Sequence, residues 1–146
     1  MLLPLALLAW GCVEGSDGPV PSSVLQACLH VDAPQERVFR DSADWERFYA
    51  DHTEGGAAPS VDFGRSVLAA RFDGTGSACV TFTLDAVVVR DGTVTIEATR
   101  RTSLDPCIDV VAYPQLLVVV ERRDTPVVFR IRDTSGAPAA GHEPCV

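Results

Sequence analysis

The chain has 146 residues, which is enough for one domain with a modest core. Its 12 basic and 20 acidic residues give a formal net charge of −8, which disfavours nucleic acid and anionic lipid surfaces as electrostatic partners. We therefore expect no nucleic-acid partner.

The chain begins with an uncharged apolar run that ends at Cys12. This layout is typical of a bacterial lipoprotein signal, in which the cysteine becomes the lipid-bearing first residue of the mature protein. We expect a signal peptide over residues 1–11, which are too few to span a bilayer, and a lipid as the only membrane anchor. The expected location is the cell envelope, on the periplasmic or outer face, with secretion as the alternative. A buried N-terminal strand or helix is disfavoured by Pro4 and by the missing amphipathic period.

The next segment is rich in Gly, Ser, Asp and Pro and has too little apolar content to pack. We predict a flexible tether over residues 12–23. Residues 24–146 are then expected to form a single β-rich domain, because no internal repeat or second domain is visible.

Most of this domain carries strand patterns separated by turns. Strands are predicted at residues 24–31, 37–40, 67–72, 79–89, 93–99, 116–121 and 127–132. The apolar run at residues 116–120 does not alternate, which predicts a central strand covered on both faces. The expected fold class is α+β, mainly an antiparallel β-sheet or small sandwich with one packed helix.

The helix is predicted to begin at Asp41, a capping side chain, and to run to about His52. Trp45, Phe48 and Tyr49 fall at i, i+3 and i+4 and form one apolar face. This spacing favours packing against a sheet over stacking on a ligand.

Asp91-Gly92 between two alternating strands predicts a β-hairpin. Residues that pair across this turn should have numbers that sum to about 183. Cys79 is then opposite Leu104, only three residues from Cys107.

Apart from Cys12, the chain has four cysteines and no Cys-x-x-Cys pair, which fits two disulfides in an oxidising compartment better than a zinc site. Four cysteines allow three connectivities. The hairpin favours Cys79 with Cys107, and Cys28 with Cys145 follows by elimination. Free buried thiols are the alternative, and they become the favoured one if the export interpretation fails.

No catalytic motif is visible. His30, His52 and His142 are scattered without metal-ligand spacing. Residues 74–77 lack the lysine of a phosphate loop and lead into a strand, so a turn is expected there. We predict no catalytic residues, no metal and no cofactor.

Five features follow one another in the chain: residues 45–49 (WERFY), 61–63 (VDF) and 66–70 (SVLAA), the hairpin, and Tyr113-Pro114 before an apolar strand. Their order resembles the C-terminal domain family of PrcB, a protease-complex subunit, over roughly residues 38–131. The chain departs from that family where a Gly-Gly-Tyr-like turn is usual. The resemblance implies a non-catalytic, often lipid-anchored accessory domain associated with an extracellular protease, with no catalytic residues to carry over.

We expect an accessory or regulatory binding partner of an extracytoplasmic protease. The alternatives are a structural envelope lipoprotein that binds a polymer or another envelope protein, and a small hydrolase. The first predicts an exposed apolar or aromatic patch near the helix and Tyr113, the second a uniformly polar surface, and the third a deep pocket with clustered titratable groups. The candidate partner surface comprises Trp45, Tyr49, Asp62, Phe63 and Tyr113.

Two arginine pairs, Arg100-Arg101 and Arg122-Arg123, are candidates for a basic patch if their strands are neighbours. Such a patch would bind an anionic partner on an otherwise acidic protein. Solvated strand ends that discourage edge pairing are the alternative.

Overall fold

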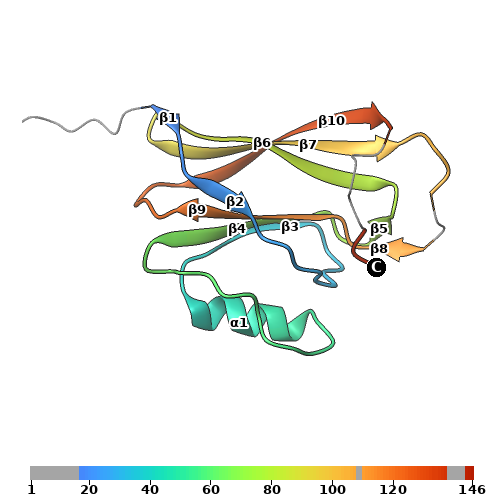
Figure 1. Cartoon of the computed structure of the whole chain (residues 1–146), viewed down its shortest axis with the longest axis horizontal. Helices are drawn as coiled ribbons and strands as arrows, with labels where there is room; N and C mark the ends of the chain where they lie inside the picture. The colour runs from blue at the N-terminus through green and yellow to red at the C-terminus, as the bar shows by residue number, and fades with distance from the viewer. Residues whose placement is uncertain (1–16, 108–109, 138–143) are drawn as a thin grey trace, which may run out of the picture.

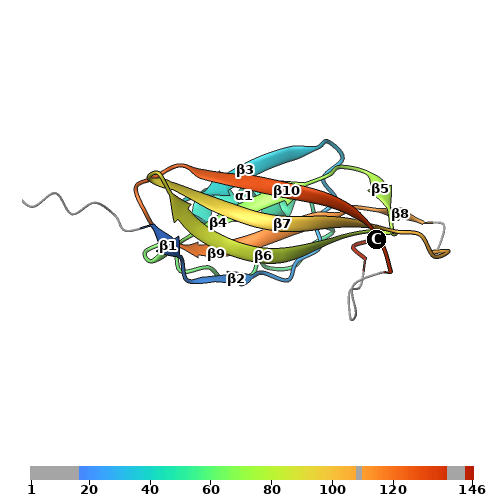
Figure 2. The ribbon, with the colours of Figure 1, turned by 90° about the horizontal axis from the view of Figure 1, so that it is seen from above.

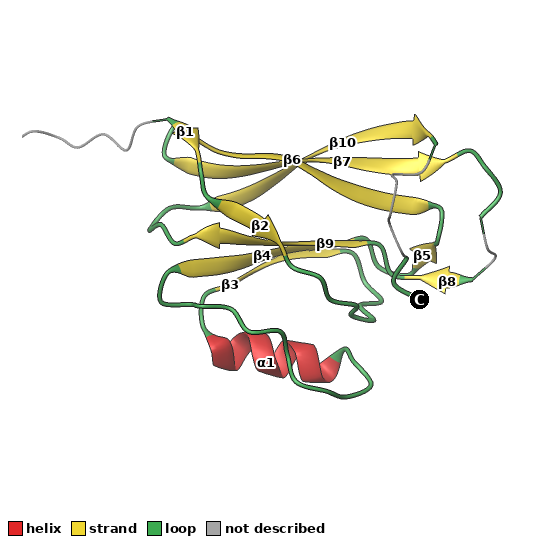
Figure 3. Ribbon diagram, viewed as in Figure 1, coloured by secondary structure: helices red, strands yellow, loops and turns green. Residues whose placement is uncertain are grey.

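The computed structural model describes residues 17–107, 110–137 and 144–146. In these residues, two β-sheets and one helix form three layers (Figures 1 and 3), which confirms a small β-sandwich that carries one helix. The elements are β1 (Gly18–Pro19), β2 (Ser22–Val24), β3 (Gln35–Phe39), α1 (Ser42–Asp51), β4 (Ser66–Phe72), β5 (Gly76–Ser77), β6 (Val80–Arg90), β7 (Thr93–Ser103), β8 (Val111–Ala112), β9 (Gln115–Glu121) and β10 (Val127–Gly136). The predicted signal peptide and Cys12 lie outside the described residues.

The first sheet has the strand order β1-β6-β7-β10, and the second has the order β2-β9-β4-β3. Figure 2, which looks down on the first sheet, shows β6, β7 and β10 side by side. β5 and β8 form a separate two-stranded ladder at the end of the sandwich where the C-terminus lies (Figure 1). The sequence pattern does not predict this ladder, because each strand has only two residues.

The hairpin forms at Asp91-Gly92 as predicted, with positive φ at both residues, as its tight turn requires. The pairs nearest the turn have numbers that sum to 183, the expected register. A β-bulge at Asp85 then shifts the pairing by one residue. Cys79 therefore lies opposite Ser103, whose N–H donates to the Cys79 carbonyl oxygen (2.8 Å), and not opposite Leu104.

β10 makes the first sheet mixed, which the mainly antiparallel prediction did not include. It pairs in parallel with β7, from Val127 opposite Val94 to Gly136 opposite Ser103. The cause is the short connection at residues 122–126, which crosses from the second sheet to the first at the end where β7 also begins. Two neighbouring strands that begin at the same end run parallel.

The predicted tether is wrong over its second half. Residues 18–24 belong to both sheets, because β1 pairs with β6 and β2 pairs with β9. Val20, between these two strands, is 6% exposed and packs between the sheets. Pro21 has no N–H to donate, and the chain leaves the first sheet at this residue. Residues 12–16 of the predicted tether lie outside the described residues.

The predicted strand at residues 24–31 is wrong beyond Val24, where β2 ends. The chain continues irregularly beside β9, and the Leu29 N–H donates to the side-chain oxygen of Gln115 (3.2 Å). Leu29 and Val31 are buried in the core under the helix. The apolar pattern here therefore reflects packing rather than ladder pairing.

β9 is a central strand buried on both faces, as its unbroken apolar run predicts. Leu116, Val118 and Val120 pack against the first sheet, whereas Leu117 packs in the core under α1. β4 beside it alternates in the same way. Each of these buried aliphatic side chains stabilises the fold by roughly 1.5–3 kcal/mol relative to exposure.

The helix α1 matches its prediction closely. Asp41 precedes it, and the Asp41 carboxylate accepts a hydrogen bond from the Asp44 N–H (2.9 Å). Trp45 and Phe48 are buried against the second sheet. The i, i+3 spacing is thus a core pattern.

Candidate functional site

Both predicted disulfides are present. Cys28 pairs with Cys145 at a Cα–Cα separation of 5.2 Å, and Cys79 pairs with Cys107 at 5.6 Å. The first links the segment after β2 to the C-terminal tail, and the second links the start of β6 to the loop after β7. Both lie near β5, β8 and the C-terminus, at what we call the disulfide end of the sandwich.

One group of metal-ligating side chains is found in the described part of the chain. It comprises Cys28, His30 and Cys145, whose ligand atoms lie within 4.8 Å of one another. The two sulfurs are bonded to each other, so neither is a thiolate that could bind a metal. His30 stacks on Tyr113 with ring centroids 4.6 Å apart. In this oxidised form the two cysteines are a disulfide and the histidine packs on an aromatic ring, so the group is structural.

A groove of about 110 Å³ lies at the disulfide end, between the start of β6 and the segment after β2. Its walls include Val24, Leu25, Val80, Phe82, Tyr113 and Gln115. None of the residues that line it carries a charge, so it offers no paired acid and base for proton transfer. The groove has room for one small uncharged group, by comparison with the roughly 150 Å³ cavity that holds benzene in an apolar core.

The predicted partner surface does not form as one surface. Trp45 is 1% exposed, and its indole N–H donates to the carbonyl oxygen of Pro59 (3.0 Å). Tyr49 is half-buried and packs edge-on against Trp45, with ring centroids 5.4 Å apart. Trp45 is therefore wrong as a contact residue, because it belongs to the core between α1 and the second sheet. Among the described residues, the aromatic side chains of α1 therefore form no exposed patch, whereas exposed aliphatic side chains (Val110, Val111 and Val146) lie near Tyr113.

The other three predicted contact residues lie at opposite ends. Asp62 is exposed before β4, and its carboxylate accepts a hydrogen bond from the Gly64 N–H (3.1 Å), which makes it a turn-capping residue. Phe63 is half-buried against the core under the helix. Tyr113 lies at the disulfide end. The structure therefore separates Tyr113 from Asp62 and Phe63 by the length of the sandwich.

The two arginine pairs are also separated. Arg122 and Arg123 follow β9, beside the start of β4, whereas Arg100 is bound to Asp73 just after the end of β4. β4 has seven residues, so roughly 20 Å separates the two positions. The joint basic patch does not form, and Arg122 instead donates to two backbone carbonyl groups at its own end.

Residues 74–77 form a turn and the strand β5, as expected. Gly74 has a φ of +78°, and a Cβ there would come within 2.7 Å of the Asp32 carbonyl oxygen, so only glycine fits. Thr75 donates from its N–H and from its hydroxyl to Asp32, both at 3.2 Å. The segment is packed against Asp32 and is not an open phosphate loop.

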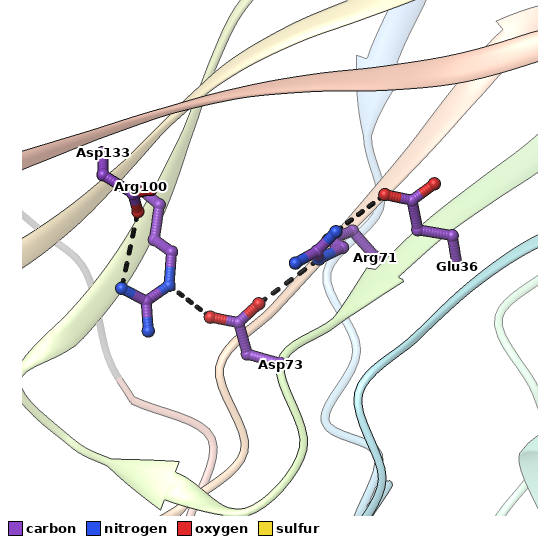
Figure 4. Close-up of polar contacts among 5 residues, drawn as sticks. All are labelled: Glu36, Arg71, Asp73, Arg100 and Asp133. Carbon is purple, nitrogen blue, oxygen red and sulfur yellow. Dashed lines mark hydrogen bonds and ion pairs between the residues drawn. The ribbon is translucent and has the colours of Figure 1, made fainter.

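Five charged side chains connect the two sheets (Figure 4). Glu36 of β3 pairs with Arg71 of β4 (2.7 Å), Arg71 with Asp73 (3.3 Å), Asp73 with Arg100 of β7, and Arg100 with Asp133 of β10 (3.5 Å). Partial burial lowers the pKa of Arg71, but hydrogen bonds to Glu36 and Asp73 raise this pKa overall. The sequence does not predict this network, because its members lie on four different strands and on the connection after β4.

Replacement of Asp73 by Asn should lower the free energy of unfolding by about 2 kcal/mol, as measured by urea denaturation. Its carboxylate is only 10% exposed and pairs with two arginines that are about one-third exposed, so the cost lies between those of buried and surface pairs. Asp133→Asn is the matched control, because this carboxylate is 76% exposed and should contribute less than 0.5 kcal/mol. Equal effects of the two changes would contradict a central role for Asp73.

The chain gave no match to any protein-family model, to any curated protein or to any solved structure. The described helix is too short to cross a membrane. The resemblance to the PrcB C-terminal domain family is therefore still a hypothesis.

Proposed function

We propose that the chain is a non-catalytic, exported lipoprotein domain that acts as an accessory or regulatory binding partner of an extracytoplasmic protease. The single observation that carries the proposal is the presence of two disulfides in one small sandwich. Such bonds form and persist in oxidising compartments and are rare in the cytosol. In this proposal a lipid on Cys12 anchors the domain to the envelope.

The groove at the disulfide end supports binding rather than catalysis. It is lined by uncharged groups, both apolar and polar, which suit a small uncharged side chain of a partner. Exposed aliphatic side chains occur near it, in β8, in the connections and at the C-terminus, namely Leu104, Val110, Val111 and Val146. These residues replace the buried aromatic face of α1 as candidates for partner contact.

The direction in which the chain enters the fold also supports an anchored domain. Figure 1 shows β1, where the described chain begins, at one end of the sandwich, while β5, β8 and the C-terminus lie at the other. Only residues 13–16 separate Cys12 from the first described residue, Asp17. A lipid on Cys12 would therefore hold the β1 end near the membrane and present the disulfide end away from it. The protease class of the partner rests on the family resemblance.

The location is tested by intact-mass analysis of the protein from membranes. We expect a lipid adduct on a chain that begins at Cys12, together with the mass deficit of two disulfides. Cys12→Ser should move the protein from the membrane fraction to the soluble fraction, whereas Ser16→Ala, in the same segment, should leave it at the membrane. An unmodified N-terminus with free thiols would overturn the export part of the proposal.

The partner is tested by cross-linking the anchored domain in native membranes and identifying the linked protein. A secreted protease whose activity changes when the domain is added supports the proposal. A wall polymer or a structural envelope protein as the linked partner would overturn the protease class. That outcome would favour the structural lipoprotein instead.

A further inference from the structure

β10 has one free edge along its length. It pairs with β7 on one side, and no described strand pairs with its other side. Val94 N–H donates to the Pro126 carbonyl oxygen and Leu104 N–H to that of Gly136, which fixes the hydrogen-bond pattern of the parallel ladder. By that pattern Arg130 and Arg132 direct their backbone groups to β7. Val127, Phe129, Ile131, Asp133 and Ser135 direct theirs outward.

The outer face of the first sheet is positive, although the protein as a whole has a net charge of −8. Strand alternation places four arginines and two carboxylates on this face, because the neighbouring positions belong to the core or to the inter-sheet network. They are Arg90, Arg101, Arg130, Arg132, Asp85 and Glu97. Glu97 lies opposite Arg130 in the ladder but is paired with Arg90 (3.0 Å), and the four arginines outnumber the two carboxylates on this face.

Arg130 and Arg132 stand two residues apart beside the free edge. Both are exposed, and Arg132 donates a hydrogen bond to Thr99 (3.2 Å), which holds its guanidinium over the sheet. Arg130 has no hydrogen-bond or ion-pair partner among the described residues. A strand added to this edge would place alternate side chains opposite these two arginines.

We infer that the free edge of β10 binds an extended acidic segment of a partner protein by strand addition. Unpaired backbone groups supply the hydrogen bonds of such a complex, and side chains on alternate positions supply its specificity. The charge of this edge selects carboxylates at every second residue. This inference rests on the binding role proposed above, to which it adds a second contact surface, separate from the disulfide end, and a partner chemistry.

A second copy of the chain fits this edge poorly. Antiparallel pairing of two β10 strands centred on residues 130–132 would place arginines of one copy opposite arginines of the other. Like charges directly opposite each other destabilise a strand pair. The same arginines that discourage self-association thus favour an acidic strand.

The test uses the full chain with both disulfides formed and a soluble ten-residue peptide that alternates Glu with Thr. The affinity is measured by titration in low salt, and amide hydrogen exchange is measured by NMR. We expect the peptide to slow exchange of the Phe129 and Ile131 amides at least tenfold. The Arg130 and Arg132 amides, which already bond to β7, should change much less.

Two variants with the same change in net charge show whether binding depends on the edge of β10 or only on the overall charge of the protein. Arg130→Gln should weaken peptide binding about threefold, the effect of one exposed charge pair. Arg47→Gln makes the same change in net charge on α1, in the opposite layer, and should leave the affinity unchanged. The peptide with Gln in place of Glu should bind more weakly than the acidic peptide.

Three results would overturn the inference. One is no binding of the acidic peptide, which would mean that the arginines only prevent the edge of β10 from pairing with strands of other molecules. Another is binding without protection of Phe129 and Ile131, which would mean side-chain contact alone. The third is concentration-dependent protection of these amides without peptide, which would assign the edge to a second copy. Because the peptide assay contains no native partner, its failure would leave the membrane cross-linking test of the proposed function unaffected.

Discussion

Removal of the Cys28–Cys145 disulfide should lower the free energy of unfolding by about 5 kcal/mol, and removal of Cys79–Cys107 by about 3.5 kcal/mol. The order follows from the sequence separations of 117 and 28 residues, because a longer closed loop restricts the unfolded chain more. The measurement is urea denaturation of the two Cys→Ala double variants against the oxidised protein. Since small domains have a total stability of 5–15 kcal/mol, the first variant should approach its unfolding midpoint without denaturant.

Reduction of the wild-type protein with a dithiol provides the control for these substitutions. The reduced protein should be no more stable than the less stable double variant, because it lacks both links. A larger effect of Cys79–Cys107 than of Cys28–Cys145 would contradict the loop-length argument. It would indicate that the link between β6 and the loop after β7 stabilises the native state itself.

Replacement of Trp45 by Ala should lower the free energy of unfolding by about 3–5 kcal/mol, the range for loss of a buried aromatic side chain. Trp45 is almost fully buried, packs against Phe39 at a centroid distance of 5.2 Å, and donates to the Pro59 carbonyl oxygen. Its loss would leave a cavity between α1 and the second sheet. Denaturation followed by circular dichroism measures the change.

Two further substitutions show whether this effect comes from the core. Trp45→Phe keeps an aromatic ring but loses the N–H donor, so its cost should be clearly smaller than that of Trp45→Ala. Glu46→Ala alters the adjacent exposed residue of the same helix and should change stability by less than 0.5 kcal/mol. If Trp45→Ala cost no more than Glu46→Ala, the assignment of Trp45 to the core would be contradicted.

The elements that could be predicted are those specified by residues close together in the sequence. Asp91-Gly92 specifies a tight turn, and the alternation on either side of it specifies the two strands and the first part of their register. Asp41 and the spacing of Trp45 and Phe48 specify the helix and its buried face. The disulfide pairing followed from the hairpin, even though the bulge at Asp85 moved the register by one residue.

The features that could not be predicted depend on contacts between distant segments. The pattern of Val127, Phe129 and Ile131 indicates a strand with one buried face, but it does not say which sheet the strand joins or in which direction. Residues 18–24 have a linker-like composition and are nonetheless ordered, because the edges of β6 and β9 accept their backbone groups. Of the two valines in this segment, Val20 is buried and Val24 is exposed, so the sequence offers little hydrophobic pattern that could predict the packing.

The candidate site was harder to predict than the fold. Aromatic residues of the helix are attractive as contact residues in a sequence, but the same residue types form the core. The arginines of β10 alternate with apolar residues. This alternation is the one feature of the sequence that indicates a charged face on this strand. The free edge beside them depends on the strand order, which no local pattern contains.

The path of the N-terminal chain determines how the domain would respond to a pulling force. A pulling force between the residues before Asp17 and the C-terminus acts along β1 and β2. Their hydrogen bonds to β6 and β9 are then loaded together in shear rather than one after another. If those strands give way, the chain can extend only as far as Cys28, where the covalent bond transfers the tension to Cys145. The helix and the central strands lie between these two cysteines in the sequence and are bypassed by the load. The domain could therefore lengthen by its first strands under tension while the core remains folded.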